Sequence, residues 1–118
     1  MAKKVFIVED DGDLSLMLQM LLEEEGYHVI TSNYPDTQEI LAQKPDLLLV
    51  DLWFGEEKEG EQLVRELKSH LDGTLPIIMM SSDHEIVEIV RETRAEAYLI
   101  KPFDIEIFLK KVKSLVAS

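Results

Sequence analysis

The sequence predicts an α/β domain in which a doubly wound, five-stranded parallel sheet is covered by helices on both faces. Five short apolar runs suited to strands alternate along the chain with five segments suited to helices. The run over residues 47–50 is wholly aliphatic, which is typical of a strand buried on both faces of a parallel sheet. Right-handed crossovers between successive strands would then place helices on both sides.

The first half of the chain reads as strand, helix, strand, helix and strand. We expect the strands at residues 5–8, 27–31 and 47–50. Asp11-Gly12-Asp13 opens the first helix and Gly26 ends it. Its apolar residues repeat at helical spacing and should face the sheet; they are Leu14, Met17, Leu18, Leu21 and Leu22. Asn33-Tyr34-Pro35 forms a turn into a short helix that ends near Lys44.

In the second half, a charged loop over 53–59 separates the third strand from a helix that Gly60 leads into. Strands at 77–80 and 97–100 flank a helix over about 83–93, and Asp104 caps the last helix. That last helix carries one apolar stripe, which should pack inward; it comprises Ile105, Phe108, Leu109, Val112, Leu115 and Val116.

Length and charge restrict the classes of function. The 118 residues include 24 acidic and 12 basic side chains, for a net charge of −12, and we expect one domain over residues 1–118. This charge argues against direct binding to nucleic acid or to anionic membranes. The apolar run after the first four residues stops at Glu9, too short for a signal peptide or a membrane span. Together with the absence of cysteine, this favours a cytoplasmic protein.

Side chains with distinct chemistry follow four of the predicted strands. They are Glu9 and Asp10, Asp51, Ser81, and Lys101. The carboxyl ends of parallel strands share one edge of the sheet, where open α/β folds bind ligands, so these groups should converge. Three converging carboxylates repel one another unless a pKa rises or a cation compensates. An all-oxygen site favours Mg²⁺ over zinc, although each acid alone could simply end a strand in water.

Four segments in this order resemble the receiver domain of two-component response regulators. They are Val-Glu-Asp-Asp at 8–11, Pro-Asp-Leu-Leu-Leu-Val-Asp-Leu at 45–52, Pro-Ile-Ile-Met-Met-Ser at 76–81 and Tyr-Leu-Ile-Lys-Pro-Phe-Asp at 98–104. The resemblance covers the whole chain. It implies a flavodoxin-like receiver fold with strand order 2-1-3-4-5, and a phosphorylation-activated signalling switch that is not an enzyme beyond its own phosphotransfer and dephosphorylation.

The resemblance also implies roles for individual residues. Asp51 would accept a phosphoryl group from the phosphohistidine of a histidine kinase or a phosphotransfer protein. The Mg²⁺ ligands would be Glu9 (through a water), Asp10, Asp51 and the backbone carbonyl of Trp53. Lys101, aimed by a cis bond to Pro102, would pair with Asp51 at rest and with a phosphoryl oxygen after transfer.

The signal would leave through a second group of residues. Ser81 would donate to a phosphoryl oxygen, and Tyr98 resembles the aromatic residue that turns inward when this hydroxyl moves. A downstream effector or output domain would read the resulting change. Lys110, Lys111 and Lys113 on the last helix could pair with acids of a second copy in a homodimer, although solvated charges near the C-terminus of a helix are the simpler interpretation.

Three positions depart from the family pattern. Gly55 stands where proline is usual, Gly60 comes one residue late, and Arg94 replaces a small residue before the last strand. Trp53, two residues after Asp51, can shield an acyl phosphate from water, so we expect slow hydrolysis.

Other classes fit the sequence less well. A flavodoxin-like cofactor binder needs a Gly/Ser/Thr-rich phosphate cradle after the first strand, where this chain has acids. A phosphatase of the haloacid dehalogenase type needs a second Asp at the position of Trp53, and a serine hydrolase needs a G-x-S-x-G elbow that is not present at Ser81. The main alternative is a non-phosphorylated, receiver-like protein-interaction module.

Overall fold

The computed structural model describes residues 2–71 and 74–116, in which five strands and five helices alternate. The strands are β1 (Lys4–Val8), β2 (His28–Ser32), β3 (Leu47–Asp51), β4 (Ile77–Ser81) and β5 (Ala97–Ile100). The helices are α1 (Gly12–Glu24), α2 (Thr37–Gln43), α3 (Glu59–Leu71), α4 (Ile86–Thr93) and α5 (Ile105–Val116). Across these described residues, no helix combines the length and apolar character needed to cross a membrane.

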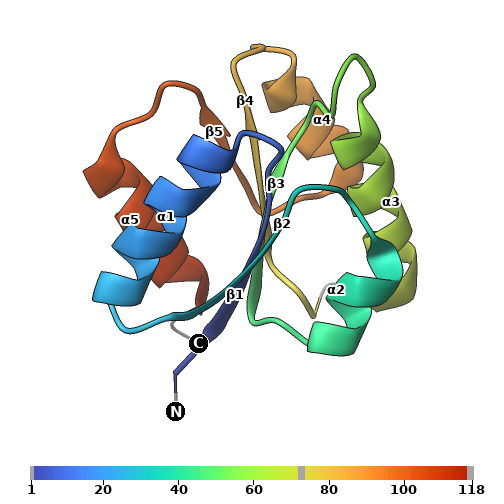
Figure 1. Ribbon diagram of the computed structural model, residues 1–118. Coiled ribbons are helices and arrows are strands. Elements are labelled where there is room, and N and C mark those ends of the chain that lie inside the picture. The colour runs from blue at the N-terminus through green and yellow to red at the C-terminus, as the bar shows by residue number, and fades with distance from the viewer. Residues whose placement is uncertain (1, 72–73, 117–118) are drawn as a thin grey trace.

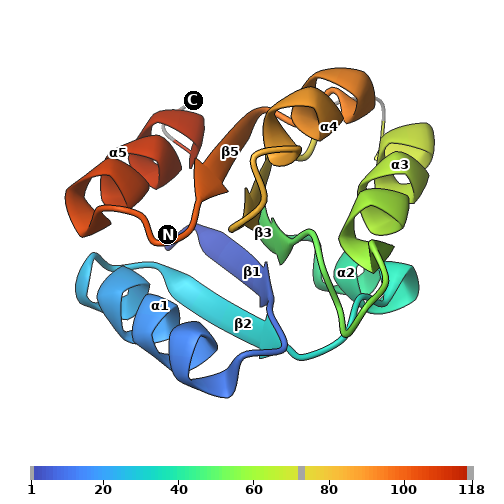
Figure 2. The same cartoon turned by 90° about the horizontal axis from the view of Figure 1, so that it is seen from above.

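The strands form one parallel sheet in the order β2-β1-β3-β4-β5, which confirms the predicted topology. Helices α1 and α5 cover one face of the sheet, and α2, α3 and α4 cover the other (Figures 1 and 2). The order reverses between β1 and β3, so the carboxyl ends of these two neighbours border the crevice in which open α/β sheets bind ligands.

Two hydrophobic cores, one on each face, hold the layers together. Side chains alternate along the buried strands, so Leu48 and Val50 of β3 join the core beneath α2, α3 and α4. Leu47 and Leu49 join the core beneath α1 and α5. Every residue of β3 is buried, as the uninterrupted aliphatic run predicts. This central strand ends at Asp51 and therefore carries that carboxylate in the fully buried middle of the sheet.

Some predicted boundaries and faces were wrong. Helix α4 begins at Ile86, three residues later than expected, because residues 83–85 form tight turns in which the Ile86 N–H donates to the carbonyl of Asp83 at 3.1 Å. Strand β2 begins and ends one residue later. Met17 and Ile105 fit the apolar stripes but are 40% and 43% exposed, because only one side of each stripe reaches the sheet.

Arg94 and Gly60 show how the chain accommodates its departures from the family pattern. Arg94 caps α4 in the left-handed conformation, with a φ of 65°, so an exposed arginine takes up backbone geometry that favours glycine. Gly60, near the start of α3, lies against the last residue of β3. A Cβ atom there would come 2.0 Å from the backbone oxygen of Asp51, and the Gly60 N–H donates to Leu52 at 3.1 Å.

Replacing Gly60 by alanine should therefore displace the start of α3 from Asp51. We expect Gly60→Ala to lower the free energy of unfolding by about 2 kcal/mol or more, since the colliding atoms belong to the backbone. Gly12→Ala is the matched control, because no atom lies within 4 Å of its would-be Cβ. It should change stability by less than about 1 kcal/mol. Urea unfolding measures both; equal stabilities would contradict this explanation.

Candidate functional site

Backbone hydrogen bonds continue past the ends of the strands and bring the candidate residues to one edge of the sheet. The Glu9 N–H donates to Ser32 at 3.0 Å, and the Leu52 N–H donates to Met80 at 2.8 Å. The Lys101 N–H donates to the carbonyl of Ser81 at 2.9 Å. These bonds fix the residues after β1, β3 and β5 in register with their neighbours, so the side-chain positions are set by the sheet itself.

Three carboxylates converge at this edge, as the sequence predicts. One oxygen from each of Glu9, Asp10 and Asp51 lies within 4.8 Å of the others. Glu9 is 1% exposed and Asp51 is 7% exposed, whereas Asp10 is exposed to solvent. The cluster is therefore buried at Glu9 and Asp51 and open to solvent at Asp10. Its oxygen donors and its concentration of negative charge suit a hard divalent cation such as Mg²⁺ that retains several waters.

Lys101 reaches into the cluster, but its closest partner differs from the expected one. Its Nζ lies 2.7 Å from Oε1 of Glu9 and 3.4 Å from Oδ1 of Asp51. The second oxygen of Glu9 accepts the backbone N–H of Asp11 at 3.1 Å. Glu9 is more deeply buried, so it needs these hydrogen bonds more than Asp51 does. The peptide bond between Lys101 and Pro102 is cis, as predicted.

The electrostatics of the cluster favour a proton or a cation on Asp51. Burial, followed by the negative charge of Glu9, raises the pKa of Asp51 to about 6, although Lys101 acts in the opposite direction. Burial alone would lower the pKa of Lys101, but its hydrogen bond to Glu9 and the charge of Asp51 outweigh burial and raise that pKa. The lysine therefore stays charged, and three carboxylates face one ammonium group.

The remaining predicted residues are Ser81, Trp53 and Tyr98, and each has contacts of its own. Ser81 ends β4 and is 1% exposed, and its hydroxyl accepts the Asp83 N–H at 3.0 Å. Trp53 is half-buried against the core on the α2, α3 and α4 side. Tyr98 pairs in register with Met79, away from the acids, and the Nζ of Lys111 lies 5.7 Å from the centroid of its ring.

Two contributors were missed from the sequence. Asp11 was assigned only to the start of a helix, yet it both caps α1 with its side chain and orients Glu9 with its N–H. Lys58 lies in the charged loop that the sequence predicts over 53–59, where no contact is expected for it. Its Nζ instead lies 5.3 Å from the centroid of the Trp53 ring and 2.5 Å from Glu85, so it links the loops after β3 and β4. Nothing in the spacing of the sequence indicates this long-range contact.

Comparison with known proteins agrees with this geometry. The family described as response regulator receiver domain matches residues 5–113. The phosphate regulon transcriptional regulatory protein PhoB of Rhizobium meliloti (strain 1021) is 37% identical over 121 residues, which cover 98% of this chain and 53% of that protein. The transcriptional regulatory protein KdpE of Staphylococcus aureus is 32% identical, over 90% of this chain and 46% of that protein. The chain spans about half the length of these curated relatives.

Solved structures give the same result for the fold. The N-terminal domain of the nisin resistance regulator NsrR superposes with a TM-score of 0.86 at 29% identity, covering 98% of this chain and 99% of that one. The chemotaxis protein CheY4 of Vibrio cholerae gives a TM-score of 0.81 at 26% identity over the same shares. Receiver domains are the phosphorylation-dependent switches of two-component systems, and they interact with histidine kinases and effector domains. With its sequence and its fold in agreement over nearly its whole length, the chain belongs to the response regulator receiver domains.

Proposed function

We propose that Asp51 is the phosphoacceptor of this receiver domain and that residues 1–118 act as one switching unit in the cytoplasm. The observation that carries the proposal is the convergence of Glu9, Asp10, Asp51 and Lys101 at the carboxyl edge of the sheet. Asp51 is the one carboxylate of the three that is both buried at the end of the central strand and joined to the lysine.

Mg²⁺ is the proposed cofactor, because the cluster offers oxygen donors and an excess of negative charge. Glu9, Asp10, Asp51 and the Trp53 carbonyl would hold it, with Glu9 acting through a water. When bound, the ion would neutralise the charge that otherwise builds up between an incoming phosphoryl group and the acids. The raised pKa of Asp51 supports this assignment, since burial and then the charge of Glu9 disfavour its carboxylate form, and a nearby cation would offset both effects.

The proposed reaction is a direct phosphoryl transfer. A carboxylate oxygen of Asp51 attacks phosphorus as the phosphorus–nitrogen bond of phosphohistidine breaks, and the freed imidazole nitrogen takes the electron pair. The product is an acyl phosphate on Asp51. Lys101 can follow the charge from the carboxylate to a phosphoryl oxygen, because its Nζ lies 3.4 Å from Oδ1 of Asp51. Ser81 can donate to another oxygen, because a hydroxyl that accepts the Asp83 N–H still has its own hydrogen to donate.

Signal output would pass from Ser81 through β5 to the surface formed by α4, β5 and α5. Lys101 follows β5 and bonds to the Ser81 backbone, so a shift at Ser81 acts directly on the strand that carries Tyr98. The proposed partners are a histidine kinase or phosphotransfer protein upstream and an effector or output domain downstream. A homodimer through α5 is a secondary prediction. Lys111 contacts the Tyr98 ring, whereas Lys110 and Lys113 are exposed and could pair with acids of a second copy.

Phosphorylation at Asp51 can be tested with acetyl phosphate and Mg²⁺. We expect intact-mass spectra to show one added phosphoryl group on the wild type and none on Asp51→Asn. Asp36→Asn is the matched control, because Asp36 caps the distant helix α2 and asparagine caps equally well. It should still be phosphorylated. Trp53 fluorescence should respond to Mg²⁺ and to the donor. A wild type that never gains mass would instead identify an interaction-only module.

The raised pKa of Asp51 predicts that, in metal-free buffer, this residue lowers the stability of the fold as pH rises from acidic to neutral. Below the unfolded-state pKa of about 3.8 both states are protonated, and the penalty for a buried charge develops as pH rises through the folded-state pKa of about 6. Asp51→Asn should therefore be more stable than the wild type at neutral pH, by on the order of 1–3 kcal/mol, and the difference should disappear toward pH 4.

Urea unfolding across this pH range, in the presence of a chelator, measures the difference between Asp51→Asn and wild type. Glu24→Gln makes the same change in net charge at an exposed position on α1 and serves as the control. Mg²⁺ added at neutral pH should narrow the gap by stabilising the wild type. A variant that is no more stable than wild type at neutral pH would show that the Asp51 charge costs nothing in the fold.

Trp53 is expected to shield the acyl phosphate. Because its ring is held between the core and Lys58, removing it should admit water to the site, and Trp53→Ala should shorten the lifetime of phosphorylated protein several-fold. Trp53→Phe retains a ring and should stay close to wild type. Decay of the phosphorylated mass after removal of the donor measures this; equal lifetimes in all three proteins would exclude shielding.

A further inference from the structure

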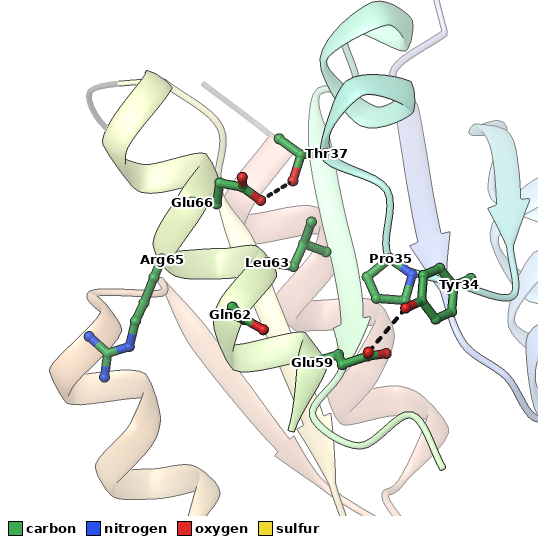
Figure 3. A pocket seen from close by; sticks show the side chains of 8 residues that line it. All are labelled: Tyr34, Pro35, Thr37, Glu59, Gln62, Leu63, Arg65 and Glu66. Carbon is green, nitrogen blue, oxygen red and sulfur yellow. Dashed lines mark hydrogen bonds between the residues drawn. The ribbon is translucent and has the colours of Figure 1, made fainter. Parts of the chain in front are cut away.

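A cleft of about 490 Å³ opens between the loop that follows β2 and the outer side of α3. It is distinct from the acid cluster, and none of its lining residues takes part in the proposed phosphotransfer. Figure 3 shows the side chains that line it: Tyr34, Pro35, Thr37, Glu59, Gln62, Leu63, Arg65 and Glu66.

The cleft combines an apolar floor with two carboxylates of fixed orientation. Leu63 is buried at the base, and Tyr34 stands 56% exposed beside it. The Tyr34 hydroxyl donates to Oε1 of Glu59 at 3.0 Å, and the Thr37 hydroxyl donates to Oε2 of Glu66 at 2.6 Å (Figure 3). Each carboxylate is thus held at the rim by an uncharged donor, which leaves its negative charge in place.

The one cation that borders the cleft is turned away from these carboxylates. Arg65 projects to the opposite side of α3 in Figure 3, where its guanidinium bonds to Glu61 at 2.9 Å. Within the described lining, Glu59 and Glu66 therefore face the cleft without a neutralising charge from Arg65. An exposed aromatic ring beside two such carboxylates matches the chemistry of an arginine or lysine, whose apolar stem packs on the ring while its head bonds to the acid.

The spacing of the two carboxylates restricts the ligand further. Glu59 and Glu66 are seven residues apart on one helix, which separates them by about 10 Å along its axis. In an extended peptide of polyproline II conformation, which has three residues per turn, side chains three residues apart point the same way and are separated by about 9 Å. A single small cation would satisfy one carboxylate only, whereas an extended segment with two basic residues at this spacing would reach both.

We propose that this cleft is a docking site for an extended basic segment of a partner protein, with two arginine or lysine side chains three residues apart. Through Tyr34, the occupant would be connected to the loop that follows Asp51. The ring of Tyr34 meets the buried ring of Phe54 edge-on, with centroids 6.4 Å apart, and Phe54 belongs to that loop. Docking requires no phosphorylation, so it can be tested independently of the proposed function.

The test uses the full chain labelled with ¹⁵N and two capped tetrapeptides as probes. Arg-Ala-Ala-Arg carries the predicted spacing, and Gln-Ala-Ala-Gln lacks the charges. We expect the arginine peptide to shift the amide signals of Tyr34, Gln62 and Leu63 in a saturable manner. The Glu59→Gln/Glu66→Gln double variant should bind it roughly tenfold more weakly, since two exposed ion pairs are lost.

A second double variant distinguishes binding in this cleft from general attraction of the peptide to the negative charge of the protein. Glu24→Gln/Glu106→Gln removes the same two charges from exposed positions on α1 and α5 and should bind like the wild type. The proposal is overturned if both double variants lose affinity equally, if shifts spread over the whole surface, or if an adjacent-arginine peptide, Ala-Arg-Arg-Ala, binds as well. An unchanged affinity in Glu59→Gln/Glu66→Gln would also overturn it.

Discussion

Repulsion among carboxylates at the end of the central strands is the constraint on which this structure depends. Glu9 and Asp51 are almost fully buried, yet Lys101 is the one ammonium group that contacts them among the described residues. A buried carboxylate without a partner is costly, and two of them together are tolerated only where the backbone prevents them from separating. The fully buried β3 and the backbone bonds beyond the strand ends supply that restraint. The backbone thus holds these carboxylates close together, despite their mutual repulsion, before any ligand binds.

Repulsion between Glu9 and Asp51 explains why Lys101 lies between these two acids. It is 2.7 Å from Glu9 and 3.4 Å from Asp51, so it stabilises the more buried acid while staying close to the other. A phosphoryl group on Asp51 would add negative charge beside the same ammonium group and draw it from Glu9. Because the Lys101 N–H is bonded to the Ser81 carbonyl, such a movement would act on the end of β4 as well as on β5. A change of charge at this edge of the sheet would therefore be transmitted to the ends of β4 and β5.

Much of this arrangement could be predicted from the sequence, because strand ends in a parallel sheet share an edge and the acids follow apolar runs directly. The cluster of Glu9, Asp10 and Asp51 is confirmed. The sheet order and the cis bond before Pro102, which the resemblance to receiver domains implied, are also confirmed. Periodicity could not reveal that Met17 is exposed, because an apolar stripe does not indicate how far the sheet extends beneath a helix. Nor could the sequence reveal that Lys101 lies closer to Glu9 than to Asp51, because this depends on how deeply each acid is buried in the folded chain.

The loop after Asp51 shows why a departure from the family pattern leaves the site intact. Gly60 lies against the Asp51 backbone oxygen so closely that the start of α3 is fixed relative to the acid. Any extra residue must then be absorbed between these two anchors. Between the anchors the chain turns sharply, where an isolated bridge joins Phe54 and Glu57 and Gly55 adopts a φ of 63°. Phe54 stays buried while the tip is exposed, so the outer loop can vary without moving Asp51.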